Sequence, residues 1–103
     1  MKATIVARAQ FFSHHGLETL ESRIDDDGTV CVWDDVAHHY TVCHALSEHD
    51  QWCIRAAAID AGRVRALSAE AAEAGDLAMC ALCDSALQGS KEGWAACSAA
   101  LAR

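Results

Sequence analysis

Cysteine and histidine are the residues of this chain best suited to chemistry, because thiolates and imidazoles bind zinc and thiolates also act as nucleophiles. The chain has six of each among its 103 residues. The possible ligand pairs are His39 with Cys43, His49 with Cys53, and Cys80 with Cys83, and the last two can each place both side chains on one face of a predicted helix. A zinc site closed by these two pairs is geometrically possible. The alternative is that the cysteines are small buried residues, a common role for free cysteine.

A cysteine nucleophile would need a neighbouring base. The candidates are Cys31 or Cys43 as nucleophile with His38, His39 or His44 as base. The sequence has no nucleophile elbow, phosphate-binding glycine loop, dinucleotide-binding fingerprint or calcium-loop pattern to accompany them. We therefore expect no catalytic residues and no enzymatic activity, and we expect no cofactor apart from the possible zinc.

A further possibility is that the segment around Trp33 binds another protein, since an aromatic anchor with a polar rim is typical of recognition surfaces. Acidic turns at both ends of the predicted hairpin would attract a basic partner over long range. The candidate partner-binding residues are Arg23, Asp26, Asp27, Trp33, Asp34, Asp35 and His39. The alternative is that the amino-terminal strand or a helix covers Trp33.

The elements that position these residues begin with strands. Alternating apolar residues predict strands over 2–12 and 17–25, joined by a turn at 13–16. The next turn is predicted as a three-residue loop over 26–28 with Gly28 in the left-handed conformation. This loop pairs Ile24 with Val30 and Ser22 with Val32, so that apolar side chains gather on one face.

A five-residue loop over 34–38 would lead into the following strand. The register that it predicts pairs Trp33 with His39, Val32 with Tyr40, Cys31 with Thr41 and Val30 with Val42. Tyr40 and Val42 would then join the core face. The opposite face would be a mixed polar surface centred on Trp33.

From residue 47 onward the chain is rich in alanine, and glycine followed by a capping residue separates the segments, which predicts short helices. The predicted helices run from the cap Ser47 to Gly62, over 63–74, from the cap Asp76 to about Gln88, and from Gly89–Ser90 onward. In the first helix, Trp52, Ala56 and Ile59 recur at helical spacing and are expected to face the core. The predicted fold is α+β: one domain over 1–103, mainly β over 1–46 and mainly α over 47–103. A three- or four-stranded antiparallel β-meander packs against three to four short helices.

The charge and composition restrict the functions that fit. With 15 acidic and 8 basic residues the net charge is −7, which disfavours direct binding to nucleic acids and to anionic membranes. No apolar run approaches the roughly 20 residues that span a bilayer, and Arg8 and Gln10 interrupt the only apolar stretch near the start. We expect a cytoplasmic protein with reduced cysteines.

Two segments resemble parts of small proteins encoded by bacterial plasmids and phages. They are VWDDVAHHYTVCHALS (Val32–Ser47) and AEAAEAGDLAMCALCDSALQG (Ala69–Gly89), which together make up about a third of the 103 residues. The resemblance implies origin in a mobile element and assigns no site residues. Small acidic proteins of that setting are often inhibitors of host defence, as the anti-CRISPR proteins are.

The expected function is therefore that of a non-enzymatic protein-binding module. Its setting would be the bacterial host cytosol, as a mobile-element accessory protein or an anti-CRISPR-like inhibitor. Its partner would be a protein with a basic surface that handles nucleic acids. A homodimer is also possible. The alternative is a zinc-stabilised regulatory module that uses the cysteine and histidine pairs.

Overall fold

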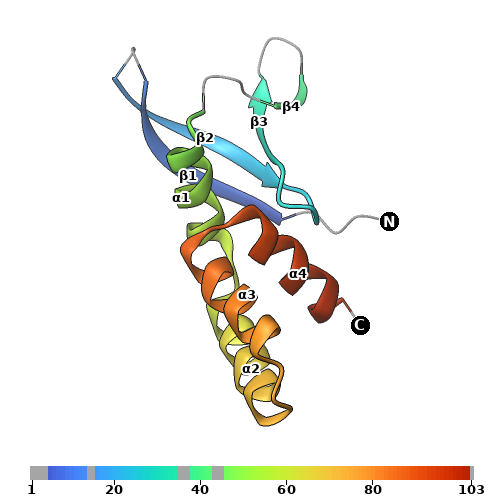
Figure 1. The fold of residues 1–103 in the computed structure, drawn as a ribbon. Helices are drawn as coiled ribbons and strands as arrows, with labels where there is room; N and C mark the ends of the chain where they lie inside the picture. Colours follow the sequence, from blue (N-terminus) through green and yellow to red (C-terminus); the bar gives the residue numbers. More distant parts are fainter. Residues whose placement is uncertain (1–4, 14–15, 35–37, 43–45, 103) are drawn as a thin grey trace.

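Four antiparallel strands and four helices follow one another along the chain in the computed structural model, which describes residues 5–13, 16–34, 38–42 and 46–102. In these residues the sheet is a meander of β1 (Ile5–Ser13), β2 (Gly16–Ile24), β3 (Val30–Asp34) and β4 (His39–Val42). The helices are α1 (Glu48–Ala58), α2 (Ala61–Glu73), α3 (Leu77–Gln88) and α4 (Lys91–Leu101). The sheet occupies one end of the molecule and α2 and α3 the other (Figure 1). The α+β prediction is confirmed.

The turn between β2 and β3 has the predicted three-residue loop. Ser22 pairs with Val32 and Ile24 with Val30. Gly28 has a left-handed backbone with φ of 86°, as a loop of this kind requires. The backbone N–H of Gly28 donates to the carbonyl oxygen of Asp25 at 2.9 Å, which closes the turn.

The register between β3 and β4 differs from the prediction by one residue. Trp33 pairs with Tyr40 and Asp34 with His39, so the loop spans 35–38 and not 34–38. Because successive strand residues point to opposite faces, this shift moves Tyr40 and Val42 away from the core, and Val42 is 50% exposed. The prediction that these two residues belong to the core is wrong. The observed register brings two aromatic rings together and keeps the tyrosine hydroxyl out of an apolar interior.

Polar side chains begin all four helices. The caps are Ser47, Asp60, Asp76 and Ser90, and each side chain accepts a hydrogen bond from a backbone N–H in the first turn. Three of these caps match the prediction. The predicted end of the first helix at Gly62 is wrong, because α1 ends at Ala58 and Gly62 lies inside α2. Asp60 accepts from the N–H of Arg63 and caps α2, which begins at Ala61, two residues before the predicted start.

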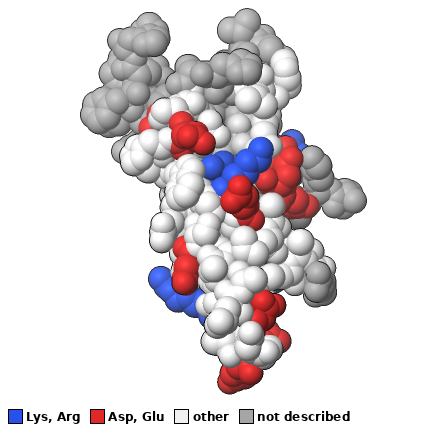
Figure 2. Space-filling model, viewed as in Figure 1, with Lys and Arg blue, Asp and Glu red and all other residues white. Residues whose placement is uncertain are grey.

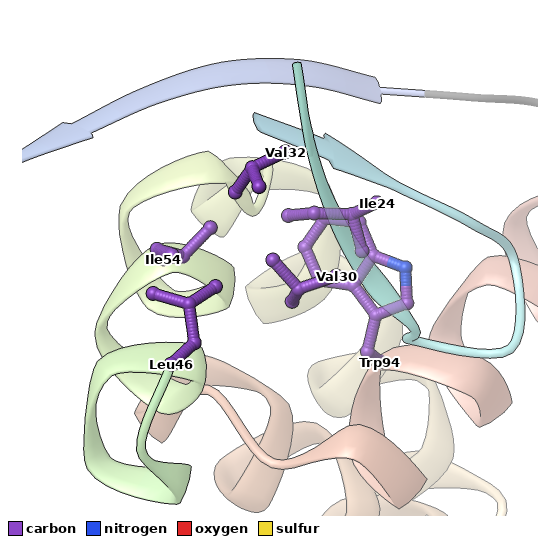
Figure 3. Packing of buried hydrophobic residues seen from close by; sticks show 6 residues of the cluster. All are labelled: Ile24, Val30, Val32, Leu46, Ile54 and Trp94. Atoms are coloured by element: carbon purple, nitrogen blue, oxygen red, sulfur yellow. The ribbon is translucent and has the colours of Figure 1, made fainter. Parts of the chain in front are cut away.

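Two clusters of buried side chains form the core of the described residues. The first lies between the sheet, α1 and α4, and comprises Ile24, Val30, Val32, Leu46, Ile54 and Trp94. Figure 3 shows Ile24 and Val30 against the indole of Trp94, with Ile54 and Leu46 facing them from the α1 side. The second lies among the helices and comprises Val64, Cys83, Ala86 and Cys97.

Arg55 is buried in α1, whereas Trp52 is not. The prediction that Trp52 faces the core is wrong, since its side chain is 38% exposed. Arg55 is 2% exposed and donates from Nε to the carbonyl oxygen of Gly89 at 2.7 Å and from Nη1 to that of Gly28 at 2.8 Å. Burial lowers the pKa of the Arg55 guanidinium, and the negative charge of Glu48 partly offsets that effect. One buried cation therefore joins α1 to two turns of the chain.

Candidate protein-binding face

The sheet presents a surface on the side away from Ile24, Val30 and Val32, which we call the outer face. Strand alternation and the observed pairing place five residues on it: Arg23, Cys31, Trp33, Tyr40 and Val42. Arg23 pairs with Cys31, and Cys31 pairs in turn with Val42, so these residues form a row across three strands. Trp33 and Tyr40 form the next row.

The aromatic pair gives the outer face a defined geometry. The rings of Trp33 and Tyr40 lie 5.2 Å apart between centroids, in an edge-to-face arrangement with an interplanar angle of 71°. The guanidinium carbon of Arg23 lies 5.6 Å from the centroid of the Tyr40 ring, within the range of a cation–π interaction. Trp33 is 36% exposed. Strand β1 pairs with the edge of β2, so the suggestion that the amino-terminal strand covers Trp33 does not hold.

The predicted partner-binding residues do not all share this face. Arg23 and Trp33 lie on it, whereas His39 is exposed but pairs with Asp34 and so alternates to the opposite side from Tyr40. Asp35 and the side chain of Asp34 lie outside the described part of the structure. Sequence reasoning missed Tyr40 and Val42, which a loop shorter by one residue would have placed beside Trp33.

Asp26 and Asp27 lie at the other end of β3, in the turn that faces the helices. Asp27 Oδ1 accepts from the backbone N–H of Thr29 at 3.0 Å, which is a role within the turn. Asp26 lines a cavity of about 260 Å³. The other walls of this cavity come from α2, from the residues that join α1 to α2, and from α4, which contributes Trp94 and Leu101. These two aspartates and the outer face are therefore separate surfaces.

Charged side chains are interspersed on the face of the molecule in Figure 2. Acidic groups occur from the sheet end to the tip formed by α2 and α3, with basic groups and neutral surface between them. The acidic groups on this side of the molecule are thus spread along its length and do not gather in one patch. A distributed charge acts through the long-range field and does not mark one contact point.

The four zinc candidates have different surroundings. His49 and Cys53 are exposed on α1, with Nε2 and Sγ 3.7 Å apart. The Cys80 thiol donates to the carbonyl oxygen of Ser68 at 3.5 Å, and Cys83 is fully buried beside Cys97. Among the described residues, no three histidine, cysteine, aspartate or glutamate side chains come together as a metal site would require.

The described cysteines are all free thiols. Cys97 donates to Cys83 with the two sulfur atoms 3.8 Å apart. Burial, with contributions from the hydrogen bond and charge of Cys83, raises the pKa of Cys97 to about 11. Such a thiol is protonated at neutral pH and is a poor nucleophile. Of the nucleophile candidates, Cys31 lies half-buried on the outer face, while Cys43 and His44 lie outside the described residues.

Comparison of the chain with known protein families, with curated proteins and with solved structures found no match. In the part of the chain that the structure describes, no helix has both the length and the apolar character needed to cross a membrane.

Proposed function

We propose that this protein is a non-enzymatic binding module that docks another protein on its outer face. The observation that carries the proposal is the group formed by the exposed Trp33 and Val42 and the half-buried Tyr40, with Arg23 beside it. Tryptophan, tyrosine and arginine are the residue types that most often dominate the binding energy of protein interfaces. An exposed aromatic on a rigid sheet can be buried by a partner at small conformational cost, because the contact between the rings already restricts both side chains.

The partner that best fits the chain as a whole is a basic protein that handles nucleic acids. A charge of −7 on 103 residues attracts a positively charged surface and speeds association with it, while the apolar outer face supplies short-range affinity. The module would then compete with nucleic acid for that surface. This is the action of an anti-CRISPR-like inhibitor or another mobile-element accessory protein in the bacterial cytoplasm, the setting that the sequence resemblance implies.

Two tryptophans of nearly equal exposure provide a matched test, since Trp33 is 36% exposed and Trp52 is 38% exposed. Wild-type protein, Trp33→Ala and Trp52→Ala are immobilised in a buffer with a metal chelator and exposed to bacterial lysate. Proteins that bind nucleic acids should be retained by the wild type and by Trp52→Ala. Trp33→Ala should bind them about thirtyfold more weakly, from the loss of about 2 kcal/mol at an interface anchor.

Salt provides the second readout. Retention should fall as ionic strength rises, because the attraction between opposite charges is screened. Equal retention by Trp33→Ala and the wild type would remove the outer face as the contact. A retained set without nucleic-acid-binding proteins would remove the proposed partner class.

A further inference from the structure

A second surface of the molecule lies on the first two turns of α1. His49 and Cys53 are four residues apart, and both are exposed. Residues at this spacing lie above one another on a helix face. The helix beneath them is held in place by the buried side chains of Ile54 and Arg55 on its other side. The imidazole and the thiol therefore project from a rigid base.

The separation between the two donor atoms corresponds to that of two ligands on one zinc ion. With Zn–N of about 2.0 Å and Zn–S of about 2.3 Å, tetrahedral geometry places the nitrogen and sulfur about 3.5 Å apart. The observed distance from His49 Nε2 to Cys53 Sγ is 3.7 Å. A zinc ion can thus replace the contact between the two side chains with little movement of either residue.

The surroundings also suit a cation. A hollow of about 450 Å³ is lined by Glu48, His49, Trp52, Cys53, Ala56 and Gln88. This lining contains one carboxylate and neither lysine nor arginine. Two ligands nevertheless leave a tetrahedral ion half coordinated. The described residues of the same chain do not complete the set, because no third ligand-type side chain joins the pair.

We propose that His49 and Cys53 form a zinc half-site that a second copy of this chain completes. A two-fold axis through the ion would bring together two imidazoles and two thiolates, which is a common ligand set of structural zinc. The two thiolates neutralise the metal charge, so that burial of the complete site between two helices does not leave an uncompensated ion. Without metal, the charge of −7 on each chain opposes association. Zinc is therefore the switch between monomer and dimer.

The first test measures mass as a function of zinc. Reduced, zinc-free full-length protein is titrated with zinc chloride and analysed by light scattering after size exclusion. The expected result is a change from 11.0 kDa to twice that mass, complete at one zinc ion per two chains and reversed by chelator. A mass that stays at 11.0 kDa, whether or not zinc binds, would overturn the proposal, and so would a dimer that forms without zinc.

Variants assign the ligands. His49→Ala and Cys53→Ser should each abolish the zinc-dependent dimer, and their helical circular dichroism should match that of the wild type because both positions are exposed. His39→Ala and Cys80→Ser are the matched controls, and both should dimerise as the wild type does. Cobalt provides a spectroscopic check, since the absorption of a tetrahedral cobalt–thiolate site should disappear in Cys53→Ser. Dimerisation of Cys53→Ser at the wild-type zinc concentration would refute the assignment.

Discussion

Arg55 in α1 donates a hydrogen bond of 2.8 Å from Nη1 to the carbonyl oxygen of Gly28 in the β2–β3 turn. A second bond, from Nε to Gly89, reaches the turn between α3 and α4. The two carbonyl oxygens come from positions 61 residues apart (89 − 28). The sheet and the helical part are thus connected through one side chain that is almost completely removed from solvent.

Arg55→Ala should lower the free energy of unfolding by about 3 kcal/mol, because it leaves two buried carbonyl oxygens without donors. Arg55→Lys should recover only part of that loss, since one ammonium group cannot reproduce the two directions of the guanidinium fork. Urea denaturation monitored by tryptophan fluorescence measures both. Arg65→Ala is the control, as Arg65 is exposed on α2 and should change stability by less than about 0.5 kcal/mol.

Gly89→Ala should be far more damaging than Gly75→Ala, although both glycines have a left-handed backbone, with φ of 100° and 73°. A methyl group at Gly89 would overlap the backbone carbonyl of Trp52, whereas at Gly75 no described atom beyond the adjoining residues lies within 4 Å of it. We expect a cost of about 1 kcal/mol for Gly75→Ala and at least about 3 kcal/mol for Gly89→Ala. Thermal denaturation compares the two, and equal losses would contradict the close approach of α1 to the α3–α4 turn.

Ser22→Ala should leave stability unchanged or raise it by up to about 1 kcal/mol. The Ser22 hydroxyl is fully buried and has no hydrogen-bond partner among the residues that the structure describes, so removing it relieves a desolvation cost. Ser90→Ala tests the opposite case. Ser90 caps α4 by accepting from the N–H of Gly93 at 3.0 Å, and its loss should cost about 1 kcal/mol. A large destabilisation by Ser22→Ala in urea denaturation would show that its hydroxyl has a partner.

Stability should decrease in alkaline solution through Cys97. Its pKa is raised from 9.0 to about 11 in the folded protein, so the unfolded chain loses this proton at a lower pH than the folded one. The stabilisation of the folded protein by the protonated Cys97 thiol is complete below pH 9.0 and is lost as the pH rises to about 11. This loss lowers the free energy of unfolding by about 2 kcal/mol. Cys97→Ala should show a smaller decrease in unfolding free energy between about pH 8 and about pH 10.5 than the wild type. Cys53→Ala, an exposed position, should keep the full decrease.

Local chemistry accounts for the parts of the fold that were predictable from sequence. The loop over 26–28 followed from the need for a left-handed glycine, and the caps Ser47, Asp76 and Ser90 followed from their positions beside alanine-rich segments. Each of these signals depends on neighbours within a few residues. That is why they could be read without tertiary information.

Tertiary contacts account for the errors. Two loop lengths between β3 and β4 were compatible with the alternating pattern, and the contacts of Tyr40 with Trp33 and Arg23 accompany the shorter one. Periodicity favoured Trp52 as a core residue, yet the buried position belongs to Arg55, whose carbonyl partners lie 27 and 34 residues away along the chain. A charged residue that replaces an apolar one in the interior gives no periodic signal.

The joint between sheet and helices relies on main-chain acceptors. Arg55 bonds the carbonyl oxygens of Gly28 and Gly89, and the indole N–H of Trp94 bonds that of Asp25 at 3.0 Å. Every amino acid provides a backbone carbonyl oxygen, so these bonds constrain the path of the chain and do not depend on the side chain of the accepting residue. An accepting position can therefore hold other residues, unless its backbone conformation requires glycine. Substitution of Asp25 should accordingly keep the hydrogen bond to Trp94 and remove only the ion pair of its side chain with Arg23, whose Nε and Oδ1 atoms lie 4.0 Å apart.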